Sequence, residues 1–315
     1  MVMRTALVAL SLVSGALCAN ADVPQVAFTQ QPGKVLVTIA GQPVATYVYA
    51  DEEITRPYFA HVRAPGGVQV TRNHPPIEDK DPTDHRTYHP GIWLAFGDIS
   101  GSDYWRNKAR VVHREFVEEP VGGPGKRTFA ARNTYLVEGD AEKANCREVC
   151  RYTIVVRPSG YLLIWDATFS AAEGEFYFGD QEEMGLGVRV ASPIMVKAGG
   201  TILDAQGRKN EREVWGNQAD WCDYSGTSDG QHVGVTLMAH PGNFRPSWLH
   251  ARDYGLLVAN PFGRKAFRQG DPSKVVVKPG EHLRLRYGVL LHTAPAEKKP
   301  DLAAAYADFL RVVAE

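Results

Sequence analysis

Imidazole and carboxylate side chains gather in one proline-rich segment, residues 73–106. The segment contains His74, Asp84, His85, His89 and Asp98. Its prolines, at positions 75, 76, 82 and 90, exclude a regular helix or a central strand, and its aromatic content argues against disorder. Histidine and carboxylate groups transfer protons near neutral pH when burial tunes their pKa values. The segment therefore predicts an ordered loop that presents proton-transfer groups ahead of a strand at residues 92–96.

A second polar stretch, residues 179–189, reads GDQEEMGLGVR. Alternate residues of a strand share one face, so Glu183 and Arg189 would point the same way with only Gly185 and Gly187 between them. Those glycines would leave open space where a ligand could approach the backbone. The alternative is a surface salt bridge beside a β-bulge.

A third concentration of polar and aromatic side chains occupies residues 215–263. Its members include Asp223, His240, Asn243, Trp248, His250, Arg252, Asp253, Tyr254 and Asn260. We expect loops here, because loops carry function more readily than scaffold strands do. Each residue has a structural explanation by itself, such as a turn at Asn260-Pro261. Their clustering leads us to expect that the three stretches converge on one pocket.

These residue types suit acid–base chemistry on a sugar, in which a proton donor and a base flank one bond. We assign His85, oriented by Asp84 or by a backbone group, as the acid and Glu183 as the base or nucleophile. Arg189 is expected to keep Glu183 ionised, and Arg252 to bind an anionic or hydroxyl-rich substrate. The other expected substrate contacts are His89, Trp93, Asp223, His240, Asn243, His250, Tyr254 and Asn260. A stacking face for the sugar is expected from Trp93, Trp221 or Trp248.

Two other classes of function compete with this assignment. His85 and His89 have the spacing that puts two metal ligands on one helical face, and His240 or His250 with a carboxylate could complete a divalent-metal site. The nearby prolines make a helix there unfavourable, so we place metal catalysis second and expect no cofactor. A non-catalytic carbohydrate-binding protein is the other alternative. Several imidazoles beside carboxylates favour an enzyme.

The composition is ordinary for a globular protein, with 44% hydrophobic and 23% charged residues among 315. A formal net charge of -1 argues against nucleic acid as a partner, and no later apolar run is long enough for a membrane span. Arg4, an apolar run over residues 6–17 and the sequence Ala19-Asn20-Ala21 predict a signal peptide at residues 1–21. We therefore expect a periplasmic or secreted protein whose mature residues 22–315 form a single domain.

Three cysteines would remain after removal of the signal peptide, namely Cys146, Cys150 and Cys222. In an oxidising compartment, Cys146 and Cys150 could close a small disulfide loop ahead of a strand at residues 152–156. Alternatively, all three are buried thiols that behave as small hydrophobic side chains. The sequence leaves both alternatives open.

Short alternating segments separated by turn residues fill the rest of the chain. Strands are predicted at residues 34–40, 44–49, 68–72, 92–96, 110–118, 127–137, 151–157, 161–170, 175–178, 188–196, 201–203, 233–239, 255–259, 274–278 and 283–292. One helix is predicted after Asp301, with an apolar face within residues 302–313. Because helix-length segments are missing between the strands, the pattern predicts an all-β fold, a large antiparallel β-sandwich with one C-terminal helix.

Three motifs carry a family resemblance, in the order PTDHRTYHPGIWLAFGDISGSDYW, EEMGLGVR and HARDYGLLVANPFG. They resemble a bacterial family labelled PmoA-like, which has no characterised function and is named after a methane oxygenase subunit. Many relatives read DHPHHRG where this chain reads DHRTYHPG, so Asp84, His85 and Gly91 carry over and His89 does so with a one-residue slip. The other recurring positions are Glu183, Arg189, His240, Asn243, His250, Arg252 and Asn260. The resemblance implies a fold similar to the supersandwich of galactose mutarotases and related carbohydrate-active proteins, and it favours a carbohydrate as partner.

Overall fold

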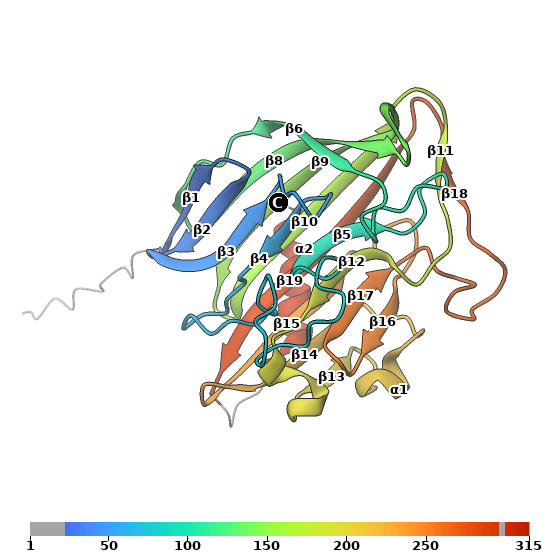
Figure 1. The fold of residues 1–315 in the computed structure, drawn as a ribbon. Coiled ribbons are helices and arrows are strands. Elements are labelled where there is room, and N and C mark those ends of the chain that lie inside the picture. Colours follow the sequence, from blue (N-terminus) through green and yellow to red (C-terminus); the bar gives the residue numbers. More distant parts are fainter. Residues whose placement is uncertain (1–22, 296–299, 315) are drawn as a thin grey trace, which may run out of the picture.

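Two large antiparallel sheets form the protein in a computed structural model that describes residues 23–295 and 300–314 (Figure 1). The first sheet contains, in spatial order, β16 (Trp248–Arg252), β17 (Leu256–Asn260), β12 (Met184–Arg189), β5 (Ile92–Phe96), β4 (Tyr58–Ala60), β3 (Gln42–Val48), β2 (Lys34–Ile39), β1 (Gln25–Gln31) and β7 (Gly123–Pro124). The second contains β13 (Thr201–Asp204), β14 (Trp221–Ser228), β15 (Gln231–Ala239), β19 (His282–Ala294), β10 (Gly160–Ala171), β9 (Asp140–Arg157), β8 (Lys126–Val137) and β6 (Val111–Glu118). A separate pair joins β11 (Phe176–Phe178) to β18 (Val275–Val277).

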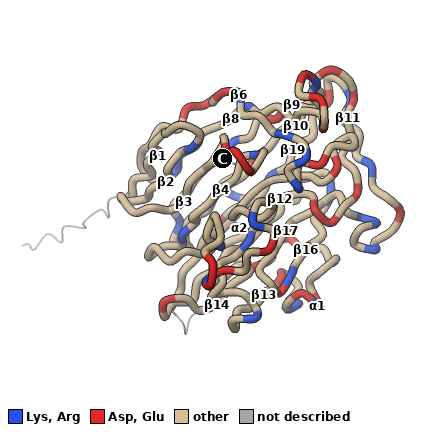
Figure 2. The backbone as a smooth tube through the Cα atoms, in the orientation of Figure 1, with Lys and Arg blue, Asp and Glu red and all other residues tan. Residues whose placement is uncertain are grey.

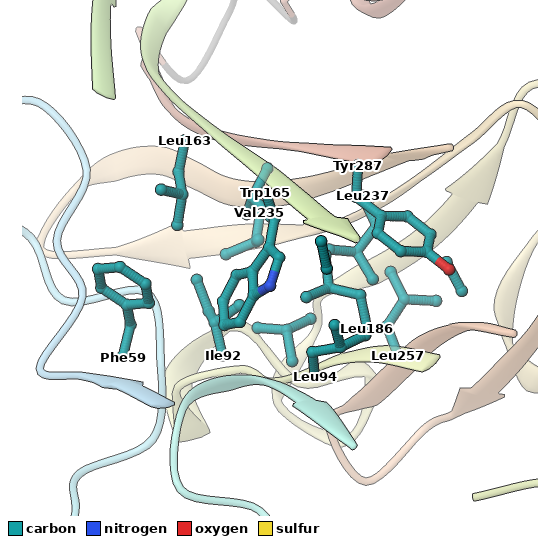
Figure 3. Close-up of a cluster of buried hydrophobic side chains, with 14 of the residues drawn as sticks. Phe59, Ile92, Leu94, Leu163, Trp165, Leu186, Val235, Leu237, Leu257 and Tyr287 are labelled. Atoms are coloured by element: carbon teal, nitrogen blue, oxygen red, sulfur yellow. The ribbon is translucent and has the colours of Figure 1, made fainter. Parts of the chain in front are cut away.

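The core lies between the two sheets, because alternate side chains of each strand point inward. In the second sheet Trp165 is paired directly with Tyr152 and Tyr287, and all three are buried. Figure 3 shows this layer facing Leu94 and Leu186 of the first sheet. The two sheets therefore share one apolar core, which fixes their relative position.

One long helix, α2 (Leu302–Ala314), covers the outer face of the second sheet. The Asp301 carboxylate accepts a hydrogen bond of 2.9 Å from the Ala304 N–H, which satisfies one of the free donors at the helix start. Phe309 and Leu302 pack against Met238 and Leu290. The predicted capping and packing of this helix are confirmed. No helix in the described ranges has the length and apolar character needed to cross a membrane.

The predicted fold class is confirmed, since the protein is a large antiparallel β-sandwich with a C-terminal helix. Several element boundaries were wrong. Residues 68–72 form only isolated bridges, and β12 starts and ends earlier than predicted, with two 3₁₀ turns after it at Ser192–Ile194 and Val196–Ala198. The short helix α1 (Asn210–Val214) and the strands β14 and β16 were missed. The predicted signal peptide lies outside the described residues.

The three cysteines within the described residues are buried thiols. Cys146, Cys150 and Cys222 are each fully buried and free. Cys146 and Cys150 both lie within β9, where four residues span roughly 13 Å, well beyond the reach of a disulfide. The disulfide alternative is therefore excluded, because the predicted small loop is continuous strand.

Candidate active site

Two rows of paired residues bring the three predicted motifs onto the outer face of the first sheet. One row consists of Trp93, Gly187, Val258 and His250, and the next of Arg189, Leu256 and Arg252. Directly opposed residues of antiparallel strands project from the same face, whereas Leu94, Leu186 and Leu257 point into the core (Figure 3). The strands β5, β12, β17 and β16 thus form the floor of a candidate site. His250 and Arg252 belong to a strand, not to the loop that we expected.

A column of aromatic rings rises from this floor to the surface. The His89 ring stacks on buried Trp93, with centroids 5.1 Å apart and an angle of 11°. The His85 ring stacks in turn on His89, at 4.8 Å and 20°. A single turn of backbone aligns the two imidazoles, because the backbone N–H of His89 donates to the backbone carbonyl of His85 at 3.0 Å. The column carries His85 outward, where 47% of its side chain is exposed.

Asp84 joins this column to the strand arginine. One carboxylate oxygen of Asp84 lies 2.8 Å from His85 Nδ1, and the other accepts a 2.8 Å hydrogen bond from Arg189 Nη2. Burial alone would raise the pKa of Asp84, but His85, Arg189 and the nearby Arg72 outweigh it and hold that pKa below its ordinary value. Asp84 is therefore a fixed carboxylate that orients the His85 ring, as predicted from the sequence.

Arg72 holds the loop that carries Asp84 and His85, and sequence reasoning missed it. Its buried guanidinium donates to the carbonyl oxygens of Pro82 at 2.8 Å, Asp84 at 2.7 Å, His85 at 3.4 Å and His89 at 3.1 Å. These bonds replace the regular hydrogen bonding that the prolines exclude. The only signal in the sequence was an arginine at the inner end of a predicted strand.

A second charged cluster forms around Arg252. Its guanidinium binds the Glu182 carboxylate at 3.0 Å and the Glu211 carboxylate at 2.8 Å, and its Nε donates to His250 Nε2 at 3.1 Å. His250 Nδ1 lies 3.2 Å from the Glu182 carbonyl, so the neutral ring carries its proton on Nδ1. Burial and Arg252 lower the pKa of His250 to about 4. His250 Nε2 lies 3.3 Å from the Glu182 carboxylate, but the imidazole is neutral near pH 7, so the two groups do not form an ion pair.

Glu183 lies directly before β12 and has a different partner from the one expected. Its carboxylate binds Arg106 Nη2 at 2.9 Å, whereas Arg189 binds Asp84. The space above Gly187 is also not open. A Cβ there would lie 2.7 Å from the Trp93 ring, so this glycine admits the indole and not a ligand. Acidic and basic residues lie close together around β12, β16 and β17 (Figure 2).

Several predicted substrate contacts lie elsewhere or are occupied. Asp223 lies in β14 and binds His292 and Thr236, on the second sheet. His240 and Asn243 lie against β19, where the Asn243 side chain bonds the backbone N–H and carbonyl of Arg286. These three residues lie outside the candidate site, because they are held against the second sheet and the site lies on the outer face of the first.

The remaining predicted contacts support the site from within. Trp93 and Trp248 are buried, and Trp221 packs beneath α2, so none of the three offers the stacking face that we expected. The Asn260 amide donates to the carbonyls of Gln181 and Glu182, and its oxygen accepts two backbone N–H groups. It therefore positions the Glu182 turn. Tyr254 is half-buried over Arg189, with the guanidinium carbon 4.6 Å from its ring centre.

The two predicted metal ligands do not converge. A metal ion lies in the plane of each imidazole that binds it, but the His85 and His89 rings are nearly parallel and stacked. Within residues 23–295 and 300–314, no group of three or more His, Cys, Asp and Glu side chains is arranged to hold a metal ion.

Acidification should weaken the native state through His250. Its folded pKa of about 4 lies below the ordinary 6.5, so only the unfolded chain takes up this proton between those values. The contribution to stability is complete above about pH 6.5 and is lost as the pH falls towards 4. We expect the difference in unfolding free energy between the wild type and His250→Gln to shrink over this range. Denaturant titrations at several pH values measure it, and a constant difference would contradict the assignment.

Gly185 should not tolerate a side chain. Its φ is +110°, and a Cβ would lie 2.2 Å from the Ala259 carbonyl oxygen. We expect Gly185→Ala to lower the unfolding free energy by about 2 kcal/mol. The control is Gly174→Ala, because no atom lies within 4 Å of a Cβ at that position. Equal unfolding midpoints for the two variants would show that the strand can relax around the new methyl group.

One protein family matches most of this chain. Residues 34–308 match a family described as a family of unknown function, DUF6807. The chain belongs to this family. No curated protein sequence matches it, and the PmoA-like resemblance remains a prediction.

Similarity to solved structures is low for this DUF6807 member. A GH36 α-galactosidase, AgaB from Geobacillus stearothermophilus, is 13% identical with a TM-score of 0.42 over 86% of this chain, which spans 41% of the α-galactosidase. A GalM/aldose epimerase homologue from C. elegans is 9% identical with a TM-score of 0.34, covering 85% of this chain and 99% of its own. The Slr1438 protein from Synechocystis is 12% identical with a TM-score of 0.34, at 90% and 100% coverage. At these values the similarities carry no argument about what the chain binds or catalyses.

Proposed function

We propose that this DUF6807 protein is a carbohydrate-active enzyme that acts on a sugar or glycoside by acid–base chemistry. The observation that carries the proposal is the Asp84–His85 pair, with Nδ1 and carboxylate 2.8 Å apart on an exposed surface. A fixed carboxylate on Nδ1 selects the tautomer in which Nε2 can accept or deliver a proton. His85 Nε2 forms no hydrogen bond with the described residues, so it is free to do this.

The second proton-transfer group is a carboxylate on the same face of the first sheet. Glu183 remains the sequence-based choice, with 32% of its side chain exposed beside Arg106. Glu182 is the structural alternative, because its carboxylate reaches Arg252 in the row of paired residues that also holds Arg189. Either carboxylate could act as a base or nucleophile opposite an imidazolium.

A sugar is the proposed substrate class because the site surface is polar, charged and partly aromatic. Guanidinium and carboxylate groups bind hydroxyl groups, and the half-buried Tyr254 ring lies nearly parallel to His85, at 6.3 Å and 12°. The PmoA-like resemblance supports the same class, as an analogy of fold. We also propose that residues 1–21 direct export and that residues 22–315 form one domain. Mass spectrometry of the mature N-terminus tests the cleavage before Asp22.

Two glutamine variants separate an enzyme from a non-catalytic carbohydrate-binding protein. We expect Glu183→Gln or Glu182→Gln to lose turnover at least about 100-fold while sugar binding is retained, because only the proton transfer is removed. Glu115→Gln is the matched control, since Glu115 is an exposed glutamate paired with Arg132 on the second sheet. Assays of binding and turnover on a glycoside panel measure both quantities. Unchanged turnover in both site variants would contradict the acid–base assignment.

A further inference from the structure

Two arginines lie side by side beneath the Asp84–His85 pair, with one carboxylate between them. The backbone N–H of Arg72 donates to the backbone carbonyl of Arg189 at 3.0 Å, so the two residues lie on adjacent chain segments. Both side chains are almost completely buried, at 1% and 0% exposure. Within the described residues, Asp84 is the only carboxylate at ion-pair distance from either, 2.8 Å from Arg189 and 3.8 Å from Arg72. At ion-pair distance two positive charges therefore face one negative charge, and Asp81 acts on Arg72 only from farther away.

The same place holds hydrogen-bond donors with no acceptor. Nε and Nη1 of Arg189, Nε of Arg72 and Nε1 of Trp93 are buried and unpaired within residues 23–295 and 300–314. Buried donors are normally paired, and a charged donor without an acceptor is the costliest kind to leave unpaired. His89 Nδ1 is buried and unpaired as well, and burial and Arg189 hold the pKa of His89 well below its ordinary value, so the neutral ring adds no third positive charge. The cluster lacks an acceptor that carries one negative charge.

We infer that Arg189 and Arg72 form a carboxylate subsite and that the substrate is an acidic sugar such as a uronate. A planar carboxylate matches the guanidinium group in geometry and charge. Nη2 of Arg189 keeps its bond to Asp84, while the unpaired Nη1 donates to the substrate carboxylate. Half-buried Tyr254 covers the guanidinium and must move aside on binding. This subsite would hold the sugar beside His85, and it rests on the proposed function for the identity of the ligand as a sugar.

Thermal unfolding of the full-length protein tests the subsite with matched probes at constant ionic strength. Glucuronate and galacturonate are compared with glucose, galactose and the methyl ester of glucuronic acid, in which a neutral methoxy group replaces the charged oxygen. We expect a saturable rise in Tm with the two uronates and none with the neutral compounds, because a ligand that binds the folded state stabilises it. Equal rises for glucuronate and its methyl ester, or no saturable rise at all, would overturn the subsite.

Two arginine variants test which side chains bind the anion, and acetate tests whether the site requires a sugar as well as a carboxylate. Arg189→Met should weaken uronate binding at least about tenfold, whereas Arg132→Gln, at an exposed ion pair on the second sheet, should leave it unchanged. The probe series on the wild type remains decisive if Arg189→Met does not fold. Acetate should saturate only at higher concentration than glucuronate. Saturation at equal concentrations would assign the site to a free carboxylate and overturn the acidic-sugar inference.

The outcomes separate this inference from the proposed function. His85→Asn keeps both arginines and should still show a saturable rise in Tm with glucuronate. Uronate binding without turnover of any sugar would leave the carboxylate subsite intact and refute the enzyme. Turnover of neutral glycosides with no preference for the charged probes would support the enzyme and refute the carboxylate subsite.

Discussion

Replacing His85 with asparagine should lower turnover by at least about 100-fold while leaving the fold intact. General acid–base groups contribute roughly 10²–10⁴-fold to rate, and asparagine cannot transfer the proton. His85 has a left-handed backbone with φ of 49°, which asparagine adopts more readily than most residues. Its side chain is also largely exposed, so little packing is lost. Initial rates on the responsive glycoside and the unfolding midpoint together measure the effect.

The adjacent Arg86 provides the control for this variant. Arg86 is exposed on the same loop, and its only ion-pair partner among the described residues is Glu53, at 3.4 Å. Arg86→Gln should therefore keep its turnover within about twofold of the wild type, since exposed ion pairs contribute little. If His85→Asn and Arg86→Gln gave similar rates, His85 would not be the proton-transfer group.

Replacing Arg72 with methionine should cause the largest loss of stability, about 3 kcal/mol or more. The substitution removes four hydrogen bonds to carbonyl oxygens of the 82–89 loop and leaves Asp84 with one cation fewer. Each buried polar group left unpaired costs about 1–3 kcal/mol. Methionine fills part of the space of the side chain, so the loss reports mainly the bonds.

Denaturant unfolding measures this loss from the shift in midpoint at constant slope. The control is Arg132→Gln, which removes one partner of an exposed ion pair and should change the unfolding free energy by less than about 0.5 kcal/mol. A loss below about 1 kcal/mol for Arg72→Met would mean that the loop keeps its shape without the arginine. In that case the placement of His85 would need another cause.

The strands and the final helix were predictable because their patterns are local. The alternation at residues 161–170 lies within β10, and Asp301 ahead of an apolar face marks the start of α2. The boundary errors also have local causes. Pro193 lies in a 3₁₀ turn where a strand was predicted, and the polar residues around His250 concealed β16.

The candidate site was predictable only in part, because partners across a sheet depend on register. The motif residues Asp84, His85 and Arg189 form one contact network. Yet Arg189 was expected to pair with Glu183, on the grounds that both lie on one face of a strand. The loop from Trp105 brings Arg106 to Glu183 instead, and no local pattern encodes that contact. Arg72 was missed for the same reason, since its acceptors are backbone carbonyls that follow it by ten or more residues.

Turnover of a panel of neutral and acidic glycosides by the purified protein, with and without chelator, decides whether the protein is an enzyme. We expect product formation in both conditions, lost in His85→Asn, with glycosides of uronic acids among the substrates. Binding of the same compounds without any product from the wild type would contradict it and identify a carbohydrate-binding protein instead.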